Sequence, residues 1–159
     1  MGGDKLKNKI VSENIGRLIR DRNFTQKELS SKANISRNTI NKLSSTKREN
    51  NPKLSTLIEI SKVLDVDFPQ LFSRNINMKS TYDRDMNLES YLNIFIQNIE
   101  IKLRGSKQKF LSSDPGIRES TVSELLNSKN ADPRLSTLIA ISEQIDTRLE
   151  LLFRRGEDV

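Results

Sequence analysis

Four side chains that carry hydrogen-bond donors gather between positions 37 and 42: Arg37, Asn38, Asn41 and Lys42. In a helix, the i,i+4 spacing places Arg37 with Asn41, and Asn38 with Lys42, on neighbouring parts of one face. Arginine and lysine can pair with guanine O6 and N7, and asparagine can bond adenine bidentately. These residue types at this spacing are therefore suited to recognising base edges.

Two short amphipathic helices are predicted around this cluster, and the first covers residues 26–33. Thr25 is a favourable N-cap, and Glu28 three residues later completes a capping-box pattern. Leu29 and Ala33 are four residues apart, so they share one face of this helix. That face is expected to pack inward.

The second predicted helix covers residues 37–43, directly after a tight polar turn. Asn34 stands at the turn, where asparagine tolerates the left-handed conformation better than most residues. Ser36 can cap the helix, whose apolar side is Ile40 and Leu43. The donor cluster then occupies the opposite side, and the two helices form a helix–turn–helix.

Several short motifs follow one another in order between Ile15 and Phe72. They are Thr25-Gln26-Lys27-Glu28-Leu29, Ile35-Ser36-Arg37-Asn38-Thr39-Ile40, Lys47-Arg48, Asn51-Pro52 and Leu54-Ser55-Thr56-Leu57. With these motifs the segment resembles the lambda-repressor-like, Cro-type (XRE family) DNA-binding domain. It departs from the family in a longer loop between Leu43 and Pro52, and in Asp65 where glycine commonly ends the fourth helix. Neither departure affects the donor cluster.

The resemblance implies roles for individual side chains on double-stranded DNA. Resembling repressors touch base edges from the positions of Arg37, Asn38 and Lys42, and Asn41 lies beside them within reach of bases or phosphates. The expected phosphate contacts are Thr25, Gln26, Ser36 and the loop pair Lys47 and Arg48. No cofactor and no metal are implied.

Three further helices are expected to complete this first domain. The first runs from about Ser12 to Arg22, the fourth from Leu54 to Leu64, and a short fifth follows a cap at Asp67 through Phe72. Residues 1–9 are predicted to be an arm, either wrapping the DNA backbone or, as we favour, frayed. The expected core comprises Leu29, Ile35, Ile40, Leu57, Ile60 and Phe72.

The chain then repeats itself. Residues 52–61, PKLSTLIEIS, return as residues 133–142, PRLSTLIAIS, with eight identities in ten. Leu71-Phe72 likewise returns as Leu152-Phe153. The fold class predicted from this repeat is all-α, with two tandem five-helix lambda-repressor-like domains. The first helix of the second domain, residues 88–104, has a longer apolar face than a small domain needs, which predicts contact with the first domain or with a second chain.

The second copy keeps the apolar scaffold but changes the exposed face. Glu119 and Glu124 stand where Arg37 and Lys42 stand in the first copy, and a carboxylate about 4 Å from a phosphate costs roughly 1 kcal/mol in water. The possible DNA contacts of this copy are Gln108, Glu119, Ser120 and Glu124. We expect it to serve in dimerisation or partner binding instead.

Charge follows the same division. The chain carries 27 basic and 21 acidic residues, a net charge of +6. Residues 1–78 hold 15 basic against 8 acidic side chains, a net of +7, whereas residues 79–159 hold 12 against 13, a net of −1. This asymmetry favours a polyanionic partner for the first half only.

Composition and short motifs argue against an enzyme. Cysteine and histidine are absent, which removes disulfides, thiolate metal sites and the commonest general base. Glu100-Ile101-Lys102 resembles half of a metal-dependent nuclease signature, with Asp85 or Asp132 as the missing carboxylate. Matches of three residues arise often by chance. No apolar run is long enough to cross a bilayer, so we expect a cytoplasmic protein without membrane contact.

The sequence therefore predicts a DNA-binding transcriptional regulator, a repressor rather than an activator, that acts as a homodimer on a pseudo-palindromic operator. Two alternatives remain open: an antitoxin-like autoregulator that binds a protein partner through residues 88–155, and an intramolecular pseudo-dimer with both copies on DNA. The expected division is an arm at 1–9, a DNA-binding domain at 10–74, a linker at 75–87, a divergent second domain at 88–155 and a tail at 156–159.

Overall fold

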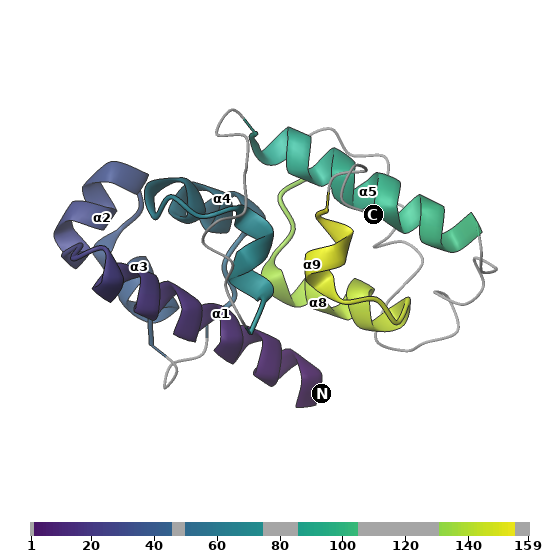
Figure 1. Cartoon of the computed structure of the whole chain (residues 1–159), viewed down its shortest axis with the longest axis horizontal. Helices are drawn as coiled ribbons and strands as arrows, with labels where there is room; N and C mark the ends of the chain where they lie inside the picture. Colours follow the sequence, from purple (N-terminus) through teal and green to yellow (C-terminus); the bar gives the residue numbers. More distant parts are fainter. Residues whose placement is uncertain (1, 46–49, 75–85, 105–130, 155–159) are drawn as a thin grey trace.

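The computed structural model describes residues 2–45, 50–74, 86–104 and 131–154, and these residues fold into helices. In chain order they are α1 (Gly2–Asp21), α2 (Gln26–Ala33), α3 (Arg37–Leu43), α4 (Leu54–Val63), the 3-10 helix η1 (Phe68–Phe72), α5 (Leu88–Arg104), α8 (Leu135–Gln144) and α9 (Leu149–Leu152). The predicted all-α class is confirmed. In Figure 1, α2 and α3 lie at one end of the molecule, and α5, α8 and α9 lie at the other.

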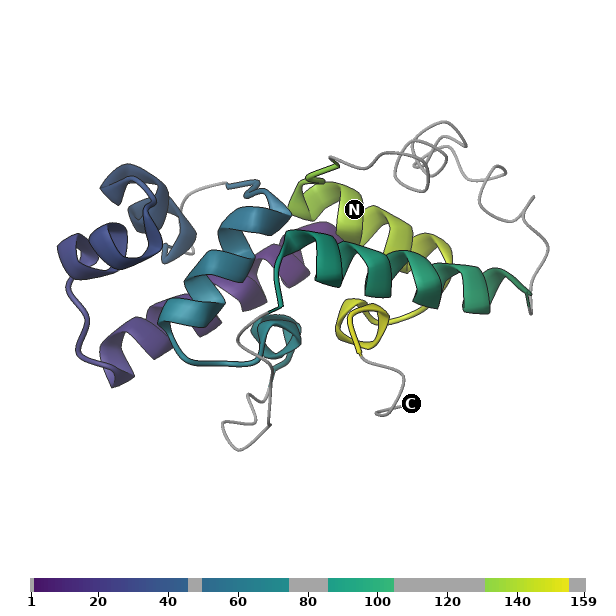
Figure 2. The ribbon, with the colours of Figure 1, turned by 90° about the horizontal axis from the view of Figure 1, so that it is seen from above.

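Helix α1 begins at Gly2, so the expected start near Ser12 is wrong. Ile10 and Val11, which the sequence reading did not place in the core, are buried. The early turns of α1 are held because the helix packs against α8, and because Asn8 Nδ2 donates to the backbone oxygen of Asn50 at 2.9 Å. Figure 1 and Figure 2 both show the N-terminal end of α1 beside α8.

A left-handed residue, Asp65, follows the end of helix α4. Asp65 has a φ of 58° at the position where glycine is common in the resembling family. Arg22 stabilises this end, donating from Nε to the Leu64 oxygen at 2.7 Å and from Nη2 to the Asp65 oxygen at 3.1 Å. The bonds satisfy carbonyls that the helix end leaves open.

The fifth helix of the first half is a 3-10 helix rather than an α-helix. Asp67 occupies its N-cap position, but its side chain makes no capping hydrogen bond, so the predicted side-chain cap is wrong. Phe68, Leu71 and Phe72 are all buried, so three of the five residues of η1 point inward. Apolar burial, rather than capping, holds this segment in place.

One continuous hydrophobic core joins the elements of both halves. Of the six core residues predicted for the first half, five are buried and Ile35 is half-buried. At the centre, the Phe153 ring lies 5.0 Å from the Phe68 ring and 4.8 Å from the Phe95 ring, measured between centroids. Tyr91 of α5 lies 4.9 Å from Phe68. Of the two contacts offered for the apolar face of α5, the structure shows the one with the first half.

Two segments that share a sequence motif lie antiparallel to each other where the halves meet. Lys53 and Arg134 form an isolated antiparallel bridge. Leu54 N donates to the Pro133 oxygen at 2.8 Å, and Leu135 N donates to the Pro52 oxygen, also at 2.8 Å. In each bond a leucine amide of one half donates to the proline oxygen of the other half, so the two bonds are equivalent under the repeat.

Side chains repeat this exchange at the starts of α4 and α8. Ser55 N donates to Asp132 Oδ1 at 2.9 Å, and Ser136 N donates to Asn51 Oδ1 at 2.9 Å. Residues 51–55 and 132–136, with these bonds, are called the reciprocal clasp below. Each half thus supplies the oxygen that caps a helix of the other.

Local details of the two halves also match. Asn14 Nδ2 on α1 donates to the Leu71 and Ser73 oxygens at 2.9 and 2.8 Å. Asn98 Nδ2 on α5 donates to the Leu152 and Arg154 oxygens, at 2.8 and 3.0 Å. Asp146, like Asp65, is left-handed, with a φ of 51°. The same side-chain type therefore ties the long helix of each half to the short helix that ends it.

Candidate nucleic-acid interface

The turn between α2 and α3 has the geometry that the sequence predicts. Asn34 adopts φ 56° and ψ 45°, and its amide bonds the Ser30 oxygen at the end of α2. Ile35 N donates to the same oxygen at 3.1 Å, and the Ser30 hydroxyl donates to the Ile35 oxygen. The turn closes on itself and fixes the angle at which α3 leaves α2.

Capping residues set where each helix begins. Thr25 Oγ1 accepts from Glu28 N at 3.0 Å and donates to Glu28 Oε1 at 3.1 Å. Ser36 Oγ accepts from Thr39 N at 3.1 Å and shares a 2.7 Å hydrogen bond with Thr39 Oγ1. Both predicted caps are confirmed. Thr25 and Ser36 are exposed, and in the free chain the hydroxyl of each stabilises the start of a helix. Their phosphate contacts stay predictions.

Helix α3 buries one side and exposes the other. Ile40 and Leu43 are almost completely buried, at 0% and 1% exposure. The four candidate base contacts are all exposed: Arg37, Asn38, Asn41 and Lys42. Since the buried pair fixes the rotation of the helix about its axis, the four donors form one outward surface, called the α3 face below.

Gln26, at the start of α2, is tied to the α3 face. Its Nε2 donates to Asn41 Oδ1 at 3.2 Å. The bond occupies one of the two lone pairs of Asn41 Oδ1 and fixes the orientation of the Asn41 amide. The structure thus brings a predicted phosphate contact and a predicted base contact together.

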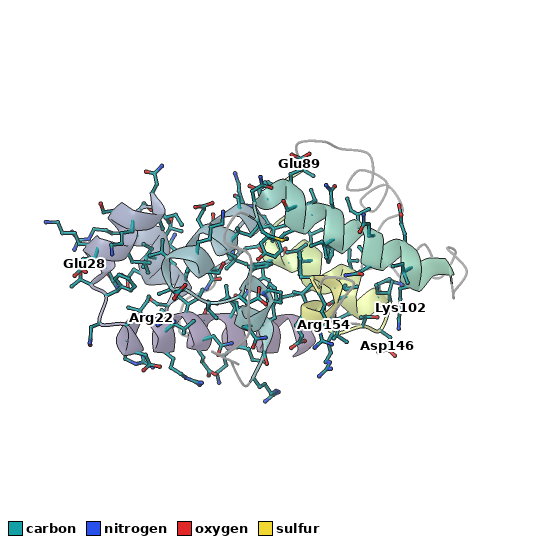
Figure 3. The ribbon with its side chains drawn as sticks, turned by 45° about the horizontal axis from the view of Figure 1, so that its top comes forward. Arg22, Glu28, Glu89, Lys102, Asp146 and Arg154 are labelled. Carbon is teal, nitrogen blue, oxygen red and sulfur yellow. The ribbon has the colours of Figure 1, made fainter. Side chains whose placement is uncertain are left out.

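Exposed charge at this end of the molecule is mostly positive. Residues 25–45 contain Lys27, Lys32, Arg37 and Lys42 against the single acidic residue Glu28, and all five are exposed. Figure 3 shows Glu28 at the α2 end of the molecule, far from Lys102 and Asp146 at the opposite end. A local net charge of +3 around the α3 face favours a polyanion there.

Several predicted contacts lie outside the described residues. They are Lys47 and Arg48 of the loop after α3, and Gln108, Glu119, Ser120 and Glu124 of the second half. Their predicted roles stay predictions.

Asn50 is a positioning residue that the sequence reading missed. Its Nδ2 donates to Ser12 Oγ on α1 and to the Lys42 backbone oxygen on α3, both at 3.2 Å, while the Asn50 backbone oxygen accepts from Asn8 Nδ2. It therefore anchors the C-terminal end of α3 to α1. A lone asparagine in a polar loop gives no signal of this role in the sequence.

Of the charged residues of the possible nuclease signature, the structure describes Glu100, Lys102 and Asp132. Glu100 and Lys102 are exposed on α5. Both carboxylate oxygens of Asp132 accept hydrogen bonds from Ser55, at 2.9 Å from the amide and 2.5 Å from the hydroxyl. Within the described ranges, no three acidic, histidine or cysteine side chains gather as metal ligands, and no helix has the length and apolar character of a membrane span.

A capped helix–turn–helix with a donor-rich outer face defines a DNA-binding module. Residues 14–75 match a family model described as the Cro/C1-type HTH DNA-binding domain. This part of the chain is a Cro/C1-type domain, as the resemblance implied, and it supports a role as a DNA-binding regulator. Comparisons with curated proteins and with solved structures give no match.

Proposed function

We propose that this protein is a sequence-specific transcriptional repressor that reads DNA with the α3 face. The observation that carries the proposal is the orientation of α3: Ile40 and Leu43 are buried, so the donor-bearing side must face outward. A helix of this kind can enter the major groove of B-DNA, where each base pair presents a distinct pattern of donors and acceptors.

Each residue of the α3 face has a chemistry that suits a particular base. Arg37 and Lys42 are suited to guanine, and Asn38 and Asn41 to adenine. The Gln26 bond to Asn41 Oδ1 favours a fixed amide orientation, which supports selective rather than general contact. A good bidentate contact discriminates against the wrong base by about 1–3 kcal/mol.

Phosphate contacts would supply the affinity that does not depend on sequence. Lys47 and Arg48 follow α3 in the chain, and Gln26, Thr25 and Ser36 stand at the starts of α2 and α3. Each phosphate neutralised by a cation releases a counterion, so binding weakens as salt rises. Repression follows from occupancy, because a protein seated on a promoter blocks other proteins from the same DNA.

For the second half we propose a divergent copy of the same domain, used for pairing rather than for reading bases. The sequence repeat, the matching Asn14 and Asn98 bonds and the left-handed Asp65 and Asp146 support common descent. Its buried aromatic residues Tyr91 and Phe153 contact Phe68 of the first half and support a pairing role.

Selection of bound duplexes from a random pool tests the reading role. Wild type should recover one preferred sequence, and Arg37→Ala should recover a sequence relaxed at one base pair, with a loss of about 1–3 kcal/mol at that position. Lys47→Ala should weaken all duplexes alike and reduce the salt slope by about one.

Each variant is the control for the other, because each removes one positive charge from the first half of the chain. If they weaken the preferred duplex and random duplexes equally, α3 does not read bases, and the proposal is wrong. Circular dichroism of Arg37→Ala should match wild type, since Arg37 is exposed, and the same measurement on Lys47→Ala checks that this variant folds.

A further inference from the structure

The contacts between the halves contain residues that meet their own counterparts. Lys53 and Arg134 hold the same place in the repeat, 81 positions apart, and they pair in an antiparallel bridge. Phe72 and Phe153 are also counterparts at this spacing, and their rings stack with centroids 5.8 Å apart. When two copies pair isologously, a position meets its own equivalent at the two-fold axis, so these two contacts place a local two-fold axis between the halves.

Contacts away from this axis occur in exchanged pairs, as two-fold symmetry requires. The amide of Ser55 bonds Asp132, and the amide of Ser136, the counterpart of Ser55, bonds Asn51, the counterpart of Asp132. Helix packing repeats the exchange, since α1 packs against α8 and its counterpart α5 packs against α4. This arrangement is that of an isologous homodimer interface, formed here within one chain.

From this geometry we infer that the chain is a single-chain pseudo-dimer, and that one chain, not two, occupies a DNA site. The inference rests on the proposed function for its DNA part. The first half's pairing surface, which includes Phe68, Phe72 and the start of α4, is covered by the second half of the same chain. A second chain therefore finds this surface filled.

The alternative is the homodimer that the sequence suggested, and the two assemblies differ in concentration dependence. When one chain binds, a tenfold dilution of protein lowers the ratio of bound to free DNA about tenfold. When two chains must first associate, the same dilution lowers it about a hundredfold, by mass action. Because the interface is already formed within one chain, no association of two chains is needed, and the ratio of bound to free DNA falls in simple proportion to the protein concentration.

The mass of the free protein is the first test. Sedimentation should give one species of 18.2 kDa, the mass of one chain, from micromolar to submillimolar concentration. A species of twice that mass would overturn the inference. This measurement needs no DNA, so it decides the inference even if the proposed function fails.

Gel shift with chains of two sizes is the second test. Wild type is mixed with a version that carries a folded tag at its C-terminus, and the probe is the duplex recovered by selection, trimmed to its preferred sequence. One chain per site gives two shifted bands, one for each size. A third band between them would show two chains on one duplex and would overturn the inference.

A scrambled duplex of equal length and composition is the matched control. Equal shifts on both duplexes, or no recovered sequence, would contradict the proposed function of base reading, while the sedimentation result would still decide the pseudo-dimer. Failure of the function and failure of the inference are therefore distinguishable.

Discussion

Asn34 is the residue of the α2–α3 turn that adopts a left-handed backbone conformation. Its φ of 56° lies in the left-handed region, which costs a residue with a Cβ atom about 1–2 kcal/mol. Asparagine tolerates this conformation because its short amide can bond nearby backbone groups. The orientation of the α3 face depends on this one residue, because the chain reverses at this position.

Asn34→Val should lower the free energy of unfolding by about 1–2 kcal/mol, since a β-branched side chain opposes the left-handed conformation. Urea unfolding followed by circular dichroism measures the change. Asn34→Gly is the matched control and should leave stability close to wild type. If valine is tolerated as well as glycine, the turn does not need a positive φ.

Gly16 decides how closely α1 and α3 approach each other. A Cβ atom at this position would lie 3.3 Å from the backbone oxygen of Ser44, just after α3. Asn50 bonds the Lys42 oxygen near the same point. The last turn of α3 is therefore seated on α1 by backbone contact and one asparagine.

Gly16→Leu should destabilise the fold by about 1–3 kcal/mol, because the added side chain meets backbone and cannot be accommodated without moving a helix. Thermal unfolding measures the loss. Arg17→Leu puts the same side chain at the next, exposed position and should change stability little. Equal melting temperatures for the two variants would show that α1 and α3 are not closely packed here.

The reciprocal clasp should have a measurable energy of its own. Asn51→Ala with Asp132→Ala removes the acceptors at the starts of α8 and α4, and each cap contributes about 0.5–2 kcal/mol. We expect a combined loss of about 2 kcal/mol in chemical unfolding.

Asp132→Asn keeps an acceptor oxygen in the clasp and is the control, since asparagine caps helices as well as aspartate does. Its free energy of unfolding should stay close to that of wild type. A double alanine variant as stable as Asp132→Asn would mean that the two caps contribute nothing.

At the level of elements, the sequence predicted the segments that carry local signals. The bounds of α2 and α3 were found because Thr25, Asn34 and Ser36 mark them within a few residues. The start of α1 was missed because residues 2–9 are mostly polar, and their helix is held by α8, which lies more than a hundred positions away. No local pattern encodes that contact.

Across the whole molecule, the repeat predicted the similarity of the halves but not how they join. Asn51 and Asp132 are both good capping residues just before a proline and a helix. Nothing in the sequence says that each caps the helix of the other half. The candidate site was predictable because its geometry is local, whereas the capping bonds of the clasp join residues 77 and 85 positions apart.

The continuous core implies that the two halves unfold together. Phe153 touches aromatic rings from both halves, including Phe68 and Phe95. Phe153→Leu leaves a small void there and should lower the free energy of unfolding by about 1–2 kcal/mol. Calorimetry should show one transition, moved to lower temperature as a whole.

Ile101→Ser is the matched control for this variant, because Ile101 is 62% exposed on α5. Its melting temperature should stay close to that of wild type. Two separate calorimetric transitions, of which Phe153→Leu moved only one, would show that the halves unfold independently.

Helix α1 runs the length of the junction, since it packs against α3, η1 and α8. Helices α3 and α8, which are far apart in the chain, thus both pack against one helix of 20 residues. A substitution that displaces α8 is therefore expected to disturb α3, the helix of the proposed DNA contact, because both pack against α1.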